Sequence, residues 1–85
     1  MGKVWLVTGA SRGLGREIVR AALAAGETVV ATARSADAAR DACGGENDRL
    51  HAFALDITDA DAANAVAAET IARCGAIDVL VNNAG

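Results

Sequence analysis

The sequence predicts an α/β protein whose parallel sheet is half of a doubly wound fold. Short apolar runs alternate with segments of helical periodicity, in the order β-α-β-α-β-α-β. The apolar runs are continuous rather than alternating, which is typical of strands that helices cover on both faces. Right-handed crossovers between parallel strands then give the strand order 3-2-1-4.

Four segments are predicted strands, and each is rich in valine, leucine, isoleucine or alanine. In chain order they lie at 3–8, 28–33, 50–55 and 77–81. The second also contains threonine, another β-branched residue that favours strands. All four are short enough to be strands of one small sheet.

A first helix is predicted over 13–25 and is closed by Gly26. Its apolar residues at helical spacing are Leu14, Ile18, Ala21, Ala22 and Ala25. A weaker second helix, at about 36–43, has Ser35 as its predicted N-cap and ends at Gly44-Gly45.

The third predicted helix begins after Thr58 or Asp59, runs to about Cys74 and is ended by Gly75. The residues that its periodicity places toward the sheet are Ala63, Val66, Ala67, Thr70, Ile71 and Cys74. The first two helices are expected on one face of the sheet and the third on the other.

Composition excludes several classes of protein. Apolar residues make up 53% of the 85 positions, too many for a disordered chain. The net charge of −3 is scattered without a basic patch, so we expect no nucleic-acid partner. No apolar run approaches the roughly 20 residues of a membrane span, and the first residues do not resemble a signal peptide. We therefore expect a cytoplasmic protein that does not bind membranes.

The two cysteines and the histidine give no sign of a metal site. Cys43 and Cys74 lie far apart in the sequence and outside any CxxC pair, and His51 is the one histidine. We expect both cysteines to be small buried or half-buried hydrophobic residues. His51, early in its strand, is expected to be a partly exposed strand residue.

Candidate binding residues follow all four predicted strands. Residues 9–15 follow the first strand, Arg34 the second, Asp56-Ile57-Thr58 the third, and residues 82–85 the fourth. Parallel strands have their carboxyl ends at one edge of the sheet, where ligands bind in such folds. The sequence therefore predicts one binding site at this edge.

The turn after the first strand is glycine-rich, with Gly9, Gly13 and Gly15 in a GxxxGxG pattern. Glycine permits a tight turn and lets the backbone approach a pyrophosphate closely. The helix that follows offers free N–H groups and the positive end of its dipole to the anion. Three glycines alone would also suit an ordinary strand-to-helix turn, but the position after the first strand favours a dinucleotide.

The motifs at these strand ends resemble those of the short-chain dehydrogenase/reductase family. Residues 8–15 match its TGxxxGxG motif, residues 82–85 match its NNAG motif, and Asp56-Ile57-Thr58 resembles its Asp-x-Thr element. The three occur in the order and at the spacing of the family, and the resemblance covers the whole chain. It implies a Rossmann-type sheet that binds a nicotinamide dinucleotide.

The resemblance also implies a role for each matching residue. The glycine-rich loop would hold the pyrophosphate and ribose, with a backbone N–H from Leu14, and Asp56 would accept a hydrogen bond from the adenine amino group. The candidate cofactor-binding residues are Gly9, Ser11, Arg12, Gly13, Leu14, Gly15, Arg34, Asp56, Ile57, Asn83, Ala84 and Gly85.

Several of these roles have structural alternatives. Asp56 also suits a helix cap or turn, and Asn82 suits scaffolding at the end of the sheet. Asn83 would help to lock the loop after the fourth strand, with Ala84 and Gly85 near the ribose. Thr8 is expected to be structural.

The end of the second strand favours NADP(H) over NAD(H). A site for NAD(H) needs a carboxylate there for the ribose hydroxyls, but the chain has Ala33 followed by Arg34. A guanidinium can bind a 2′-phosphate through two N–H bonds, and Arg12 and Ser11 are within the adjacent loop. Both arginines could instead be solvated surface residues.

As a function, the resemblance implies an NADP-dependent oxidoreductase that transfers hydride between nicotinamide and a small-molecule carbonyl or alcohol. Family members act through a serine and a Tyr-x-x-x-Lys pair that follow NNAG, and this chain has no tyrosine and one lysine, Lys3. We therefore expect residues 1–85 to be the N-terminal part of a single dinucleotide-binding domain, truncated after NNAG, without catalytic residues.

The resemblance further implies a homo-oligomer at full length. The alternative function is a non-enzymatic dinucleotide-binding sensor or regulator. Other Rossmann-like proteins, such as methyltransferases, typically need an acid after the second strand, and it is absent here.

Overall fold

The computed structural model describes residues 2–45 and 47–83 and contains the predicted alternation of strands and helices. The elements are β1 (Val4–Val7), α1 (Gly13–Ala24), β2 (Thr28–Ala33), α2 (Ala36–Ala42), β3 (Leu50–Ala54), α3 (Ala60–Cys74) and β4 (Val79–Val81). Ala84 and Gly85, two predicted cofactor residues, lie outside the described residues.

The four strands form one parallel sheet in the predicted order, β3-β2-β1-β4. β1 is an inner strand: Leu6 is in register with Val30 of β2 on one side and with Leu80 of β4 on the other. On the far side of β2, Val29 is in register with Leu50 of β3. The carboxyl ends of all four strands therefore lie at one edge of the sheet.

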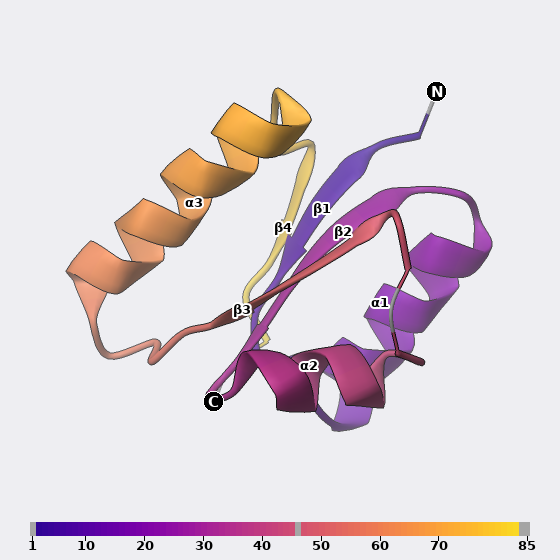
Figure 1. Ribbon diagram of the computed structural model, residues 1–85, viewed down its shortest axis with the longest axis horizontal. Coiled ribbons are helices and arrows are strands. Elements are labelled where there is room, and N and C mark those ends of the chain that lie inside the picture. The colour runs from indigo at the N-terminus through magenta and orange to yellow at the C-terminus, as the bar shows by residue number, and fades with distance from the viewer. Residues whose placement is uncertain (1, 46, 84–85) are drawn as a thin grey trace.

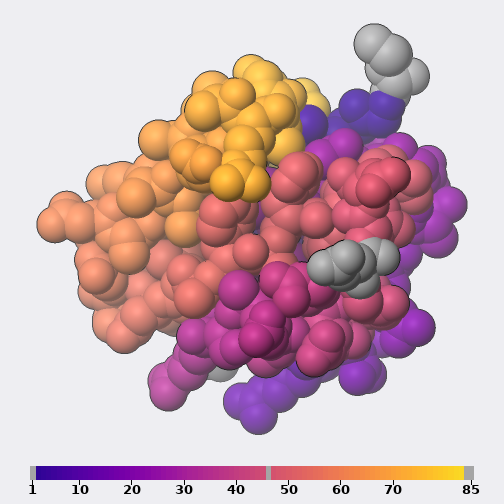
Figure 2. Space-filling model, viewed as in Figure 1, coloured from indigo at the N-terminus to yellow at the C-terminus, as the bar shows by residue number. Residues whose placement is uncertain are grey.

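Helices cover both faces of the sheet, as predicted (Figure 1). Successive strand residues point to opposite faces. Val7 and Val29 accordingly pack in one buried cluster with residues of α1 and α2, whereas Leu6 and Val30 pack in a second cluster with Val66 of α3. In the space-filling view, α2 and α3 flank the residues of the edge strand β3 (Figure 2).

The apolar face predicted for α1 is correct at Ala22, which is buried, and at Ile18, which packs against the core, but wrong at Leu14, Ala21 and Ala25. The residues that the helix buries are Gly15, Val19, Ala22 and Leu23. Leu14 is 66% exposed, and Ala21 and Ala25 are also exposed. The reason is the close approach of Gly15 to the loop after β1, which turns the adjacent Leu14 toward solvent.

The predicted caps of the other two helices are confirmed. The Ser35 hydroxyl accepts a hydrogen bond from the Ala38 N–H at 3.3 Å, and the Asp59 carboxylate accepts from the Ala62 N–H at 3.0 Å. Gly75 ends α3 in the left-handed conformation, with φ of 87°. Each of these caps follows from the chemistry of one residue at the helix end.

α3 buries a narrower stripe than its periodicity suggests. Val66 and Thr70 are buried, and the Thr70 hydroxyl donates to the Val66 carbonyl at 2.8 Å. Ile71, which we expected to face the sheet, is 52% exposed. Ala63 and Cys74, also expected to face the sheet, are partly buried and pack against the cluster beneath the helix, so the fully buried part of α3 is confined to its centre.

β4 is shorter than the predicted 77–81 and begins at Val79. Asp78 lies at its start, where its carboxylate accepts from the Val4 N–H at 2.8 Å and its own N–H donates to the Val4 carbonyl at 2.9 Å. Ile77 packs with the cluster beneath α3. Within the described ranges, no helix has both the length and the apolar character needed to cross a bilayer.

Candidate functional site

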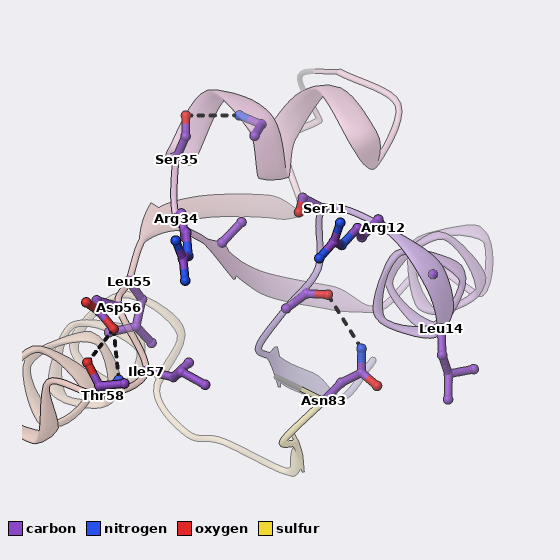
Figure 3. A pocket seen from close by; sticks show the side chains of 14 residues that line it. Ser11, Arg12, Leu14, Arg34, Ser35, Leu55, Asp56, Ile57, Thr58 and Asn83 are labelled. Carbon is purple, nitrogen blue, oxygen red and sulfur yellow. Dashed lines mark hydrogen bonds between the residues drawn. The ribbon is translucent and has the colours of Figure 1, made fainter. Parts of the chain in front are cut away.

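A cleft of about 910 Å³ lies at the carboxyl edge of the sheet. All four strand ends contribute to its lining: residues 9 and 11–14 after β1, 33–35 and 38 after β2, 55–58 after β3, and Asn83 after β4. Figure 3 shows these side chains around a shared space. The predicted convergence of the four segments is therefore present, and the cleft is within the usual size range of ligand sites.

The glycine-rich loop turns sharply because two of its glycines adopt left-handed backbone conformations. Gly9 has φ of 63° and Gly13 has φ of 62°, values that side chains strongly disfavour. The loop is tied to the sheet by the Ala10 N–H, which donates to the Thr32 carbonyl at 2.9 Å. Cys43, buried behind the loop, donates from its Sγ to the Ala10 carbonyl at 3.7 Å.

Gly15 allows the start of α1 to contact both this loop and the segment after β4. A Cβ at Gly15 would lie 2.7 Å from Nδ2 of Asn83 and closest of all to the carbonyl oxygen of Gly9. Neither distance is compatible with a real side chain. Glycine is therefore needed here for close packing, and its φ is not one of the left-handed ones.

Thr8 connects the first and last segments of the site. Its hydroxyl oxygen accepts from the Asn83 N–H at 3.0 Å and lies 3.2 Å from Oδ1 of Asn82. Asn83 also reaches the glycine-rich loop, where its Nδ2 donates to the Gly9 carbonyl at 3.5 Å. The structural roles expected of Thr8 and Asn82 thus agree with the contacts they make.

The N-terminus of α1 differs from those of α2 and α3. Arg12 is its N-cap residue, and no side chain among residues 2–45 and 47–83 caps the helix there. The first turn of α1 also carries no acidic residue. The first N–H groups of a helix have no partner within it, so they point to the space ahead of the helix. Here that space is the cleft, and the arrangement suits an anion.

Two arginines extend into the cleft, as Figure 3 shows for Arg12 and Arg34. Both are exposed, and both line the cleft with Ser11. Arg34 directly follows Ala33, the last residue of β2, so no carboxylate occupies this strand end. A phosphate in this part of the cleft would be within reach of cations from two different loops.

Asp56 lies two residues after the end of β3, on the same side of the cleft as Arg34 and across from Arg12 (Figure 3). Its Oδ1 accepts hydrogen bonds from the Thr58 hydroxyl at 2.7 Å and the Thr58 N–H at 2.9 Å. These two bonds, together with the positive charge of Arg34, hold the pKa of the Asp56 carboxyl below its ordinary value. Asp56 therefore forms the turn that we gave as its structural alternative, and it also lines the cleft.

Two apolar candidates differ in their placement. Ile57 is 48% exposed and points into the cleft (Figure 3). The Leu14 side chain points away from the other residues of the site, although the residue lines the cleft (Figure 3). This is consistent with the backbone role predicted for Leu14.

Five residues that line the cleft are not among the predicted cofactor-binding residues: Ala33, Ser35, Ala38, Leu55 and Thr58. Ser35 and Ala38 belong to the first turn of α2, and the N-cap motif there was a usable signal. Thr58 was part of the Asp-x-Thr pattern, but its hydroxyl received no role. Among residues 2–45 and 47–83, no group of His, Cys, Asp or Glu is arranged to hold a metal ion.

A family model described as short chain dehydrogenase matches residues 3–85. The chain belongs to the short-chain dehydrogenase family. The 3-oxoacyl-[acyl-carrier-protein] reductase FabG of Vibrio harveyi is 46% identical over 99% of the chain. Oxidoreductase BOA17 of Botryotinia fuckeliana is 40% identical over 100% of it.

Solved structures of short-chain dehydrogenases share this fold. One from Streptomyces avermitilis superposes with a TM-score of 0.92 at 54% identity, covering 100% of the chain and 31% of that structure. A metagenomic short-chain oxidoreductase in complex with NADP has a TM-score of 0.86 at 42% identity, covering 99% of the chain and 39% of that structure. The chain spans about a third of the length of the curated relatives it matches, 34% and 31%.

Proposed function

We propose that the chain is the cofactor-binding part of a longer NADP(H)-dependent oxidoreductase, which transfers hydride between nicotinamide and a carbonyl or alcohol group of a small molecule. The observation that carries this proposal is the pair Arg12 and Arg34 in a cleft where the end of β2 offers no carboxylate. The NADP complex of a relative with 42% identity supports the choice of cofactor.

The residues of the cleft fit a dinucleotide phosphate. The uncapped start of α1 faces the cleft and provides free N–H groups for a pyrophosphate. Gly15 keeps the helix against the glycine-rich loop, since a Cβ there would collide with Gly9 and Asn83. Arg12, Arg34 and Ser11 provide the donors that a 2′-phosphate needs.

This geometry separates the role of the cofactor from the role of the chain. When bound, the cofactor supplies the hydride chemistry, and the chain binds and orients its adenosine and pyrophosphate parts. Asp56 and Ile57 would hold the adenine ring by its amino group and its face, and Asn83 would fix the loop that continues toward the nicotinamide side. The acid and base of the reaction would come from residues after position 85.

Titration of the full-length protein with NADPH and NADH tests the cofactor assignment. We expect NADPH to bind more tightly, and we expect Arg34→Asp to weaken NADPH binding by about 10- to 100-fold, because a charge-assisted hydrogen bond to a phosphate contributes about 1.5–3 kcal/mol. NADH affinity should hold or rise, since a carboxylate at this position can accept from the ribose hydroxyls.

Arg20→Asp is the matched control for this experiment. Arg20 is an exposed residue of α1 that does not line the cleft, so the same change of charge there should alter NADPH binding far less. Tighter binding of NADH than of NADPH by the wild-type protein would overturn the assignment. An equal loss of NADPH affinity in the two variants would also contradict it.

The remaining features of the full-length protein are part of the same proposal. We place it in the cytoplasm, as a homo-oligomer without a nucleic-acid partner. Light scattering of the purified full-length protein measures its oligomeric state. Loss of NADPH absorbance with a panel of small ketones and aldehydes, and its return with the matching alcohols, tests the reaction class.

A further inference from the structure

We propose that Thr58 is a positioning residue that orients the Asp56 carboxylate toward the adenine amino group and so sets the preference of the site for adenine over other purine bases. This inference rests on the proposed NADP(H) function. It assigns a role in cofactor specificity to a side chain that does not itself need to contact the cofactor.

The contacts at Asp56 support this role. The hydroxyl and the N–H of Thr58 both donate to the same oxygen, Oδ1, at 2.7 and 2.9 Å (Figure 3). A carboxylate held by two donors from one residue has a fixed plane and a fixed direction. In the part of the chain that the structure describes, these side-chain hydrogen bonds use Oδ1, so Oδ2 is available to accept from a ligand.

The position of Thr58 argues against a role in stability alone. Asp56 and Thr58 are both exposed and both line the cleft, so their hydrogen bonds do not lie in a core. The helix that follows has its own cap, Asp59, whose carboxylate accepts from the Ala62 N–H. The Thr58 hydroxyl is therefore not needed to begin α3, and what it orders is the carboxylate at the cleft.

Hydrogen bonding also keeps the carboxylate in the form that accepts from an amino group. The Thr58 bonds lower the pKa of Asp56, and the charge of Arg34, on the loop after β2, lowers it further. The neighbouring acid is Asp59, at the start of α3, whose N–H donates to the Asp56 carbonyl. The Asp59 carboxylate itself accepts from the Ala62 N–H. Without the Thr58 hydroxyl, the pKa of Asp56 should rise toward its ordinary value.

The test compares NADPH with its hypoxanthine analogue, which has a carbonyl oxygen where adenine has its amino group. In the full-length protein, we expect NADPH to bind about 10-fold more tightly than the analogue, as one charge-assisted hydrogen bond would give. Thr58→Val should reduce this ratio to within about threefold. Thr58→Ser, which keeps the hydroxyl, should retain the ratio.

A pH series gives a second, independent readout. In the wild-type protein, the ratio of NADPH affinity to analogue affinity should fall as the pH falls through the lowered pKa of Asp56. The 2′-phosphate, whose second pKa is about 6, also titrates, but it is common to both nucleotides and cancels in this ratio. In Thr58→Val the fall in the ratio should begin at a higher pH, and Thr58→Ser should restore the wild-type profile. A purely structural role for Thr58 would lower the affinity for both cofactors equally and leave the pH profile unchanged, which would overturn the proposal.

Asp56→Ala separates failure of this inference from failure of the proposed function. If the wild-type protein binds neither nucleotide, the proposed function is wrong and the inference fails with it. If Asp56→Ala leaves the ratio unchanged, Asp56 does not recognise adenine and Thr58 has nothing to position. If Asp56→Ala abolishes the preference but Thr58→Val retains it, NADP(H) binding stands and the role of Thr58 is refuted.

Discussion

Replacement of Gly15 by alanine should destabilise the protein, although alanine is the better helix former. The exchange favours the helix by up to about 1 kcal/mol. The new methyl group, however, would lie 2.7 Å from Nδ2 of Asn83 and against the carbonyl of Gly9. Overpacking of this kind costs about 1–3 kcal/mol, and a backbone carbonyl cannot rotate away as a side chain can. We expect a net loss of about 1–2 kcal/mol in the free energy of unfolding.

Urea unfolding of the full-length protein measures this loss, and NADPH titration should show weaker binding because the start of α1 is displaced. Ala21→Gly, at an exposed position of the same helix, calibrates the helix propensity term. Adding Asn83→Ala to the Gly15→Ala protein removes one of the two collisions and should recover part of the loss. A Gly15→Ala protein as stable as wild type would refute the steric argument.

Two further predictions concern the amino edge of the sheet and the start of α3. The Glu27 carboxylate accepts from the Lys3 N–H at 3.1 Å and from Nε1 of Trp5 at 2.7 Å, and these bonds lower its pKa from 4.5. The ionised Glu27 carboxylate stabilises the fold fully at pH values above its ordinary pKa of 4.5. This stabilisation is lost as the pH falls through the lowered pKa of Glu27 in the folded protein. The Trp5 indole N–H resonance should therefore shift at acid pH, and a shift that persists in Glu27→Gln would contradict the assignment. Asp59→Ala should cost about 1 kcal/mol in urea unfolding through loss of the cap, and Asp61→Ala, in the same turn, should cost less; equal losses would argue against the cap.

Elements set by local chemistry could be predicted from the sequence. The four strands could be predicted because each is a short, mostly apolar run between helical segments, as is typical of a parallel sheet that helices cover on both faces. The starts of α2 and α3 are correct because Ser35 and Asp59 accept hydrogen bonds from N–H groups three residues later. Such caps depend on near neighbours in the chain, and the rest of the fold hardly changes them.

The buried face of α1 could not be read from the spacing of its apolar residues. Glycine contributes nothing to a hydrophobic pattern, so Leu14 was counted and Gly15 was not. In the fold, the absence of a side chain at Gly15 lets the start of α1 lie against Gly9 and Asn83, and the buried face continues through Val19, Ala22 and Leu23. The contact with Asn83 joins residues 68 positions apart, so a pattern of neighbouring residues does not show it.

The location of the candidate site could also be predicted from the sequence, whereas the directions of its side chains could not. Its location follows from topology, because all parallel strands end at one edge, and the loops beginning at Gly9, Arg34, Asp56 and Asn83 do meet there. The directions of individual side chains do not follow from topology. The bond from Thr58 to Asp56 depends on the local turn after β3, and the sequence pattern alone did not reveal it.

The pairing of β1 with β4 has a consequence for the order of folding. β1 can pair with β2 as soon as the chain up to residue 33 is available, and β3 can then add to β2. The other edge of β1 stays open until residues 79–81 arrive, so it is the contact of greatest sequence separation in the sheet. The bond between Thr8 and Asn83 forms with that last step. The part of the cleft that Asn83 lines can therefore form only after the segments that follow β1, β2 and β3 have been synthesised.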